Sequence, residues 1–494
     1  MNIDYDNIEK QVAAPAASSM IETLRAIGYN LGTALADIID NSISAGAKNI
    51  WISRTWEGDQ TTITIKDDGK GMNNEELIEA MRPGSQNPLT DRSTTDLGRF
   101  GLGLKTASFS QCRRLSVISK KDGETHYWTW DLDYVGQSGK WELVHWIPEG
   151  FSDCLESFDS GTIVIWSLLD RAIPIGTRKD DVKSHQKFSE LWKNVKQHIA
   201  MTFHRFIENK EINIFFGEYE LEPWDPFCRS ENATAPKSEE YIYIGDKKIL
   251  VKGYVLPHQN KFSSEQAYIK AAGNLGYPAL QGFYVYRGER LLLAGNWLGL
   301  FRKEVHYNLV RIMIDLPNTM DAEWQIDIKK SSATLPFYCK DQLKFYASSV
   351  RNDGAEVYRH RGKILKRKAG TAFVPLWLDK KSGDRWSFVI NRDHPMIKEV
   401  ETMAKEFPKK AINTLLSFVE ETIPTKSIFI KESEEQEKQK EPLAEIDENV
   451  IMPIIKKIYN NKLEEGYKES EAKSYLLTME PFNHFEEIIN NLNL

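Results

Sequence analysis

The chain has 494 residues, of which 41% are hydrophobic and 27% are charged, a composition typical of compact globular domains. This length is enough for about three domains of ordinary size. The net charge of −7 argues against polyanion binding over the whole surface, although a local basic patch is compatible with it.

The compartment expected from the sequence is the cytoplasm. No apolar run approaches the roughly 20 residues that span a bilayer, so no membrane contact is expected. The polar start MNIDYDNIEK is unlike a signal peptide. The four cysteines are scattered singly without a CxxC pair, which is typical of a reducing compartment and argues against a zinc site.

The first chemically informative element is a helix expected over residues 33–44. Its apolar side chains share one face at 100° per residue: Leu35, Ile38, Ile39 and Ile43. The opposite strip is polar and holds Asp37, Asp40, Asn41 and Ser44. Either this strip is an ordinary solvated face, or Asp37 and Asn41, one turn apart, point into a site.

A glycine turn follows the next two expected strands, KNIWISRTW and TTITIKDD, which alternate apolar and polar residues. The second strand ends at Asp67, and Gly69 and Gly71 follow in the segment IKDDGKGMNNEEL. Glycines let the backbone take a positive φ or come close to a ligand. A carboxylate beside such a glycine floor can accept a hydrogen bond from an exocyclic amine such as that of adenine. An ordinary structural turn would carry the same DxGxG string.

A glycine-rich segment, TTDLGRFGLGLKTASFS, precedes a helical pattern. Its residues of interest are Gly98, Gly101, Gly103 and Lys105. Successive backbone N–H groups in such a segment can turn toward one anion, and the start of the helix adds partial positive charge. The segment differs from the dinucleotide-binding pattern because no strand leads into it. The polar stretch before it, residues 81–96, is typical either of disorder or of a lid.

More strands and a long helix complete this first part of the chain. RRLSVISKKDGETHYWTWDLDYV predicts two strands joined by a hairpin turn at Asp122-Gly123, and GTIVIWSLL predicts another strand. SHQKFSELWKNVKQHIAMTFHRFI predicts the helix that closes the unit.

The second part is expected to be another α/β or α+β domain, beginning near INIFFGEYELEPWDPF. Its strands are expected in KKILVKGYVL, QGFYVYRGERLLLAG and NLVRIMIDL. Residues 341–368 read as helical and increasingly basic, and the segment starting at RWSFVINRDHPMIKEV as mostly helical. The last ~50 residues predict two amphipathic helices, the first with apolar residues at helical spacing: Ile451, Ile454, Ile455 and Ile458.

The polar helix, the DxGxG turn and the GxxGxG segment, taken together and in this order, resemble the Bergerat-fold (GHKL) ATPases. This superfamily includes gyrase B, the heat-shock-ninety chaperones, histidine kinases, MutL and the microrchidia (MORC) proteins. Gly161-Thr162 stands where these proteins place a Gly-Thr pair behind the adenine pocket. The resemblance covers at least residues 21–169 and implies an α/β (α+β sandwich) ATP-binding domain.

The resemblance also implies roles for single residues. Asn41 stands where the family holds Mg²⁺, and Asp67 where it accepts the adenine amino group. Thr162 would complete the base contacts. The other implied ATP contacts are the pocket floor and the phosphate cradle, formed by Gly69, Gly71, Met72, Gly98, Gly101, Gly103 and Lys105.

Two positions depart from the family pattern. Asp37 replaces the glutamate that orients the attacking water in most hydrolysing members. Because aspartate is one methylene shorter, we expect slow hydrolysis, and a member that binds ATP without turnover is compatible with the sequence. Ser44 replaces an aspartate found in many relatives, a change that touches packing more than chemistry.

A second resemblance concerns the domain after the ATP site. AEWQIDIKKSSATLP is similar to the loop of the MutL and MORC transducer domain (ribosomal S5-type) whose lysine enters the ATP site. Lys330 is the expected catalytic lysine, and Lys329 is the alternative. A pair of solvent-exposed lysines in an ordinary turn would give the same sequence. GFYVYRGERLLLAGNW looks like the "YRN-R-L" strand pair of the same branch.

The sequence lacks the features that mark several other members of this superfamily. About 20 residues precede residue 21, too few for a histidine-kinase phosphoacceptor helix. The DxD pair Asp131 and Asp133 is better explained as a strand edge than as a Toprim metal site. Neither a MutL-type DQHA motif nor the clustered cysteines of a CW zinc finger is present.

The expected organisation is an arm, two α/β domains and a helical C-terminal part. The boundaries are 1–19 for the N-terminal arm, 20–210 for the ATPase domain, 211–344 for the transducer-like domain, 345–430 for a basic and helical region, 431–445 for a charged linker and 446–494 for a C-terminal helical module.

The resemblance implies an ATP-dependent homodimer that acts as a clamp or gate on double-stranded DNA, in a prokaryotic stand-alone protein of a restriction or phage-defence system. A basic cluster would contact DNA phosphates: Arg359, Arg361, Lys363, Lys366, Arg367 and Lys368. A solvated helix face explains these charges equally well. The arm could swap across the dimer, and the C-terminal helices could dock another protein. A chaperone-like ATPase and a non-hydrolysing ATP-binding scaffold are the alternatives.

Overall fold

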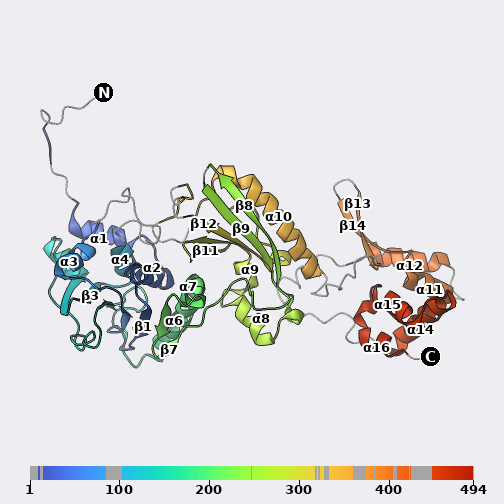
Figure 1. Cartoon of the computed structure of the whole chain (residues 1–494), viewed down its shortest axis with the longest axis horizontal. Helices are drawn as coiled ribbons and strands as arrows, with labels where there is room; N and C mark the ends of the chain where they lie inside the picture. The colour runs from blue at the N-terminus through green and yellow to red at the C-terminus, as the bar shows by residue number, and fades with distance from the viewer. Residues whose placement is uncertain are drawn as a thin grey trace. The chain divides into compact units, whose positions relative to one another are not determined.

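The computed structural model describes most of the chain, which divides into two compact units, residues 1–363 and 364–494 (Figure 1). The described residues are 9–11, 15–84, 103–245, 247–317, 320, 323–327, 333–359, 374–382, 385–403, 409–421, 423 and 448–492.

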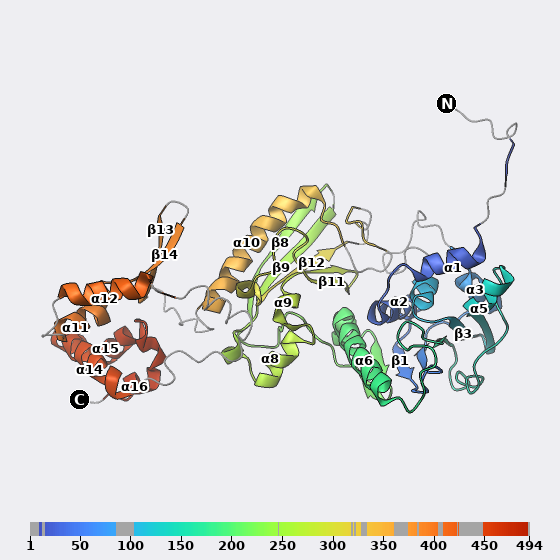
Figure 2. The ribbon, with the colours of Figure 1, turned by 180° about the vertical axis from the view of Figure 1, so that it is seen from behind.

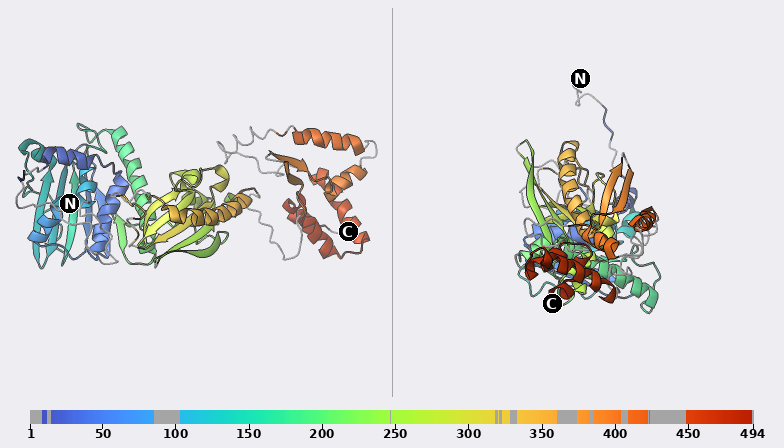
Figure 3. Two further views of the ribbon diagram at one scale, coloured as in Figure 1. Left: turned by 90° about the horizontal axis from the view of Figure 1, so that it is seen from above. Right: turned by 90° about the vertical axis from the view of Figure 1, so that its right-hand side faces the viewer.

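The first unit contains a seven-stranded sheet with the strand order β4-β3-β5-β2-β1-β6-β7. Its strands are β1 Asn49–Arg54, β2 Thr62–Asp67, β3 Arg114–Lys121, β4 Glu124–Asp131, β5 Gly161–Ser167, β6 Asn213–Phe216 and β7 Tyr219–Glu220. Neighbours are antiparallel except β1 and β6, which are parallel. The left panel of Figure 3 shows the blue and teal strands of this sheet side by side.

The β3–β4 hairpin forms as the sequence predicts, whereas the end of β4 and the opposite edge of the sheet, formed by β6 and β7, differ from the prediction. Asp122 and Gly123 both have a positive φ, at 53° and 86°, as the expected tight turn between β3 and β4 requires. β4 ends at Asp131, whose side chain accepts from the backbone N–H of Asp133 and starts a helix where the strand was expected to continue. β6 and β7 follow residue 210, so the first sheet extends past the boundary expected for the ATPase domain.

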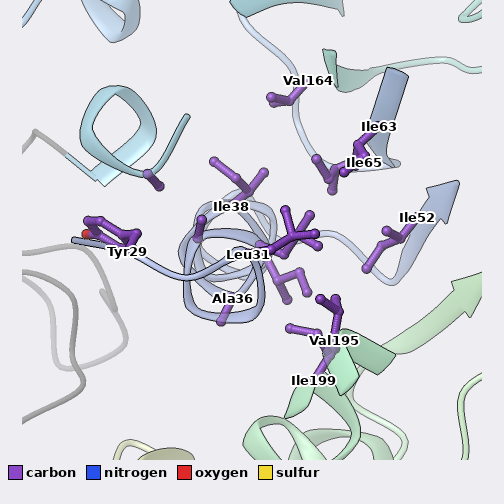
Figure 4. Packing of buried hydrophobic residues seen from close by; sticks show 14 of the residues in the cluster. Tyr29, Leu31, Ala36, Ile38, Ile52, Ile63, Ile65, Val164, Val195 and Ile199 are labelled. Atoms are coloured by element: carbon purple, nitrogen blue, oxygen red, sulfur yellow. The ribbon is translucent and has the colours of Figure 1, made fainter. Parts of the chain in front are cut away.

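Helices cover one face of this sheet and make the domain a two-layer sandwich, so the expected α/β (α+β sandwich) class is confirmed. The helices of this part are α1 Ala17–Arg25, α2 Leu31–Ser44, α3 Asn74–Met81, α4 Gly103–Phe109, α5 Leu132–Ser138, α6 Val182–Thr202 and α7 His204–Glu208. Figure 4 shows α2 end-on, with its apolar side chains among those of the strands, such as Ile65 and Val164, and those of α6, such as Val195 and Ile199. A smaller cluster around Ile163 and Ile165 packs on the opposite face.

A second sheet of five strands follows within the same unit, in the order β11-β10-β12-β9-β8. Its elements are β8 Ala235–Ile244, β9 Lys247–Val255, η1 Gln259–Lys261, α8 Glu265–Ala272, α9 Gly276–Leu280, β10 Gly282–Arg287, β11 Arg290–Asn296, η2 Val305–Tyr307, β12 Val310–Leu316 and α10 Phe337–Arg359. Each of the three expected segments contains strand. Figure 2 shows the long helix α10 along this sheet, in agreement with the burial of Leu343, Ala347 and Val350 against its strands.

The second unit is mostly helical, as expected, and also contains a two-stranded hairpin. Its elements are β13 Trp377–Ser382, β14 Arg385–Ile390, α11 Pro395–Met403, α12 Lys409–Glu421, α14 Glu448–Glu464, α15 Glu469–Leu477, η5 Phe482–His484 and α16 Glu486–Asn490. RWSFVI therefore forms a strand, not the start of a helix. Ile451, Ile455 and Ile458 are buried on α14, as their spacing predicts. Within the described ranges, every helix is too short or too polar to traverse a bilayer.

Candidate nucleotide site

The helix that carries the expected site residues begins two residues earlier than the sequence suggested. Asn30 caps α2: its side chain accepts a hydrogen bond from the backbone N–H of Thr33 at 2.9 Å, and the Thr33 hydroxyl faces the Asn30 backbone in return. Such a capping box fixes the start of a helix by satisfying its free N–H groups. The helix therefore holds its polar strip in a defined rotation against the sheet.

The polar strip of α2 is not an ordinary solvated face. Asp37 and Asp40 are 3% and 1% exposed, whereas Asn41, one turn after Asp37, is exposed. Burial of two carboxylates needs hydrogen-bond donors or opposite charge around them. The strip thus combines buried acids with an exposed amide at the edge of a core, an arrangement that ordinary amphipathic packing does not produce.

Donors from outside the helix hold both oxygens of Asp37. The hydroxyl of Tyr29 donates to Oδ2 at 2.8 Å, and Nη2 of Arg290 lies 3.5 Å from Oδ1. Burial and the negative charge of Asp37 raise the pKa of Tyr29, so its hydroxyl keeps its proton and remains a donor.

Arg290 is the residue at this site that sequence reasoning missed. It begins β11 in the second sheet, is 2% exposed, and places Nε 2.8 Å from the carboxylate of Asp40. Burial, together with the positive charge of Arg290, lowers the pKa of His198 on α6 to about 4, so this imidazole is neutral at pH 7. The available signal was the arginine of the segment that looks like the "YRN-R-L" strand pair, but its partner Asp40 lies 250 residues away in the chain.

The expected adenine acceptor, Asp67, is buried at the end of β2 with two donors. Ser42 Oγ donates to Oδ2 at 2.8 Å, and the backbone N–H of Gly69 donates to Oδ1 at 2.9 Å. Burial raises the pKa of this carboxyl group, and the two hydrogen bonds oppose the shift. Asp67 lies opposite Thr162 in the β2–β5 register, so the sheet brings these two expected base contacts together.

A hydrogen-bond network links the pocket floor to the Gly-Thr pair. Ser119 on β3 accepts from the backbone N–H of Met72 at 2.9 Å, and its hydroxyl lies 2.9 Å from that of Thr162. Gly71 has a φ of +64°, and a Cβ at this position would overlap the carbonyl oxygen of Lys120. The glycine is therefore required for close packing of this turn against β3. Ser119 was not expected from the sequence.

The phosphate end of the expected site is described only in part. α4 begins at Gly103, where a Cβ would lie 4.0 Å from Asp37 Oδ2, so the start of α4 faces the acidic strip of α2. Lys105, expected in the phosphate cradle, lies in the first turn of α4. It is 2% exposed and its ammonium donates to the carbonyl of Ala80 at 2.9 Å, while burial lowers its pKa to about 8.

Several expected contacts lie outside the described residues. These are Gly98 and Gly101 of the glycine-rich segment, both candidate lysines, Lys329 and Lys330, and the basic residues Arg361, Lys363, Lys366, Arg367 and Lys368. The backbone of Arg359 is the last residue of α10, and its side chain is outside the description as well.

A cavity of about 750 Å³ opens elsewhere on the same domain, between α1, α3 and β4. Its walls are mainly apolar and include Met20, Leu24, Ile78, Trp128 and Trp130. Among the described residues, none of the expected nucleotide contacts lines this cavity.

Comparison with known families agrees with the geometry. Residues 29–162 match the family of histidine kinase-, DNA gyrase B- and HSP90-like ATPases. This chain carries a GHKL ATPase domain, the Bergerat fold. The matched range begins at Tyr29 and ends at Thr162, and it contains the described nucleotide-site residues of α2, the β2 turn and α4.

Two kinds of curated relative share this GHKL domain. The chaperone protein HtpG of Rickettsia canadensis is 28% identical over 185 residues, which cover 35% of this chain and 27% of the chaperone. The ATPase morc-1 of Caenorhabditis elegans is 30% identical over 123 residues, which cover 24% of this chain and 13% of the worm protein. The matches thus span less than a third of either relative, and they support the MORC/MutL-like GHKL superfamily.

The residues present fit the ligands that a GHKL domain binds, ATP and, in most members, Mg²⁺. Asp67 is a buried acceptor at a glycine turn, which suits an exocyclic amine. Asn41 offers an exposed amide oxygen, a ligand type that Mg²⁺ accepts together with phosphate oxygens and water. The donor set therefore agrees with the family.

Proposed function

We propose that this protein is a Mg-ATP-dependent ATPase that closes as a homodimer on ATP binding and acts as a nucleotide-switched clamp or gate on DNA. The observation that carries the proposal is a pair of buried carboxylates next to α2: Asp37 lies on this helix, and Asp67 at the end of β2 is bonded to Ser42 of the same helix. Asp37 faces the start of α4, and Asp67 faces the glycine turn after β2. One acid suits hydrolysis and the other suits base recognition.

In this proposal the adenine amino group donates to Asp67, while Ser42 and Gly69 hold the carboxylate in place. Thr162 and Met72 complete the base side of the pocket. Discrimination between adenine and guanine follows, because the oxygen of a guanine would face an acceptor and leave it unsatisfied.

At the phosphate end, Asn41 would hold Mg²⁺, which would supply positive charge to neutralise the phosphates. Asp37 orients the water that attacks the γ-phosphate and accepts its proton. Lys330, or its neighbour Lys329, would stabilise the γ-phosphate charge.

The choice of DNA rests on the basic cluster from Arg359 to Lys368 and on the likeness to a MORC ATPase. Cations on one segment would bind phosphates without sequence preference and with strong salt dependence. A role in restriction or phage defence belongs to the same proposal. The second candidate is a chaperone-like ATPase, which the HtpG relatives favour; its turnover would respond to unfolded polypeptide and not to duplex DNA.

The test measures light scattering and phosphate release on the full chain, without nucleotide, with ATP and with a non-hydrolysable analogue. Each condition is run with duplex DNA, with an unfolded protein and with neither. The proposal predicts nucleotide-dependent dimers that Asn41→Ala prevents, and DNA-stimulated turnover that Asp37→Ala abolishes. Turnover that responds to unfolded protein alone would favour the chaperone. Closure of a dimer with no phosphate above the Asp37→Ala background would identify a non-hydrolysing scaffold.

A further inference from the structure

The contact of interest joins α2 of the ATPase domain to the edge strand of the second sheet. Arg290 is the first residue of β11, directly after the tight turn Gly288-Glu289, whose residues have positive φ values of 53° and 65°. β11 is the edge strand of its sheet. This edge therefore presents Arg290 to the first domain at a position fixed by a hairpin.

One guanidinium serves two carboxylates of the same helix. Nε lies 2.8 Å from Asp40, and Nη2 lies 3.5 Å from Asp37. Asp37 and Asp40 are three residues apart, so they share a face of α2 and a planar fork can reach both. All three side chains are at most 3% exposed, so solvent barely screens the interaction.

The surroundings keep this arginine in place. The Phe203 ring lies 5.8 Å from its guanidinium carbon, and one hydrophobic cluster includes side chains of α2, α6 and β11, such as Leu291. Nearby, the ring nitrogen of His204 pairs with the hydroxyl of Tyr286 at 2.9 Å, a second polar link between α7 and β10. The second sheet is therefore anchored where Arg290 meets the acids.

We propose that Arg290 is a positioning residue for ATP hydrolysis: from the second domain it fixes the orientation of Asp37, while Asp40 anchors the guanidinium. With Tyr29 on one oxygen and Arg290 on the other, the plane of the Asp37 carboxylate is set by groups outside its own helix. This matters because aspartate must direct a water with a shorter side chain than glutamate, and its angle decides whether that water lies in line.

A consequence is that movement of β11 changes hydrolysis without touching the nucleotide. Arg290 contacts neither Asn41 nor Asp67, so its removal leaves the proposed ATP contacts in place. Because Asp37 is catalytic only if the ATPase proposal holds, this role of Arg290 rests on that proposal.

The chain offers a matched control for the experiment. Arg205 on α7 also forms an ion pair with the second sheet, with Nη1 2.8 Å from Asp315 of β12, and it does not contact Asp37. Arg205→Gln therefore removes ion pairs from α7 to Asp315 and to Glu289 of the β10–β11 turn, 3.4 Å away, without removing a contact to Asp37. Arg290→Lys keeps the positive charge but loses the fork that reaches both acids.

The experiment measures ATP affinity, single-turnover phosphate release and thermal unfolding of the full chain for wild type, Arg290→Gln, Arg290→Lys and Arg205→Gln. We expect Arg290→Gln to slow release about 10- to 100-fold at unchanged ATP affinity, and Arg290→Lys to recover part of that loss. Arg205→Gln should keep the rate within about twofold.

Two results would overturn the inference, and they are distinguishable. If Arg290→Gln and Arg205→Gln slow release equally, or if Arg290→Gln loses affinity, rate and stability together, the arginine is only a structural link. If wild type itself releases no more phosphate than Asp37→Ala, the proposed ATPase function fails, and the role of Arg290 fails with it.

Discussion

The two ends of the proposed nucleotide site, an adenine end and an acidic end, differ in how they are built. The adenine end, around Asp67, draws on residues of one sheet and one helix within about 120 residues of chain, from Ser42 to Thr162. The acidic end, around Asp37, needs Arg290, which belongs to another sheet. Base recognition can therefore be complete within one domain, whereas the environment of the expected catalytic acid is completed by the next domain.

The largest expected effect concerns the acidic end. Replacing Asp37 by alanine removes the acceptor for the attacking water and should slow phosphate release about 10²- to 10⁴-fold. ATP affinity should stay within a few-fold, because the base contacts lie elsewhere. Quenched-flow phosphate release and equilibrium nucleotide binding give the two quantities; a variant that still turns over at the wild-type rate would remove Asp37 from the mechanism.

A substitution at the adenine end should change ATP affinity, not the rate of phosphate release. Asp67→Ala removes a buried acceptor and leaves the Ser42 hydroxyl and the Gly69 N–H without it, which should weaken ATP binding by about 1–3 kcal/mol. The preference for ATP over GTP should shrink as well, because that preference comes from this acceptor. Competition binding with both nucleotides measures it, and an unchanged preference would place the base elsewhere.

The close packing of Gly71 in the pocket floor can be tested through the free energy of unfolding. Gly71→Ala places a Cβ against the backbone of β3 at a positive φ, and should lower the free energy of unfolding by about 2 kcal/mol or more. Gly123→Ala is the matched control, since that glycine also has a positive φ but nothing within 4 Å of a Cβ. It should cost about 1 kcal/mol. Equal losses in urea unfolding would contradict the close approach.

The smallest expected effect concerns Lys105. Its pKa is about 8 in the folded protein against an ordinary 10.5, so between these values the unfolded chain binds more protons. Stability should therefore rise with pH, by about 1–2 kcal/mol from pH 8 to pH 9.5, relative to Lys105→Met. Parallel pH dependences of unfolding in the two proteins would show that this ammonium is not buried as described.

The same contrast explains what the sequence could predict. The positions of the proposed adenine contacts follow from local signals: Asp67 at a strand end, glycines after it, and a Gly-Thr pair on a strand that the sheet places opposite. The buried pairing of Asp40 with Arg290 could not be predicted, because the polar strip of α2 reads equally well as a solvated face. Only packing of a second sheet against α2 makes these charges partners.

Other differences have equally physical causes. β6 and β7 join the first sheet because β6 pairs in parallel with β1, a long-range contact with no local signature. Lys105, expected at the phosphates from its place after GxxGxG, donates to the carbonyl of Ala80 near the end of α3, a contact with no local signature in the sequence. Both contacts depend on tertiary packing.

The most direct test of this contrast measures ATP affinity and single-turnover phosphate release on the same preparations of wild type, Asp67→Ala and Arg290→Gln. A site built from separable ends predicts a crossed pattern: Asp67→Ala weakens affinity with little change in rate at saturating ATP, and Arg290→Gln slows release with unchanged affinity. If both variants change the same quantity, the two ends are not separate and the account is contradicted.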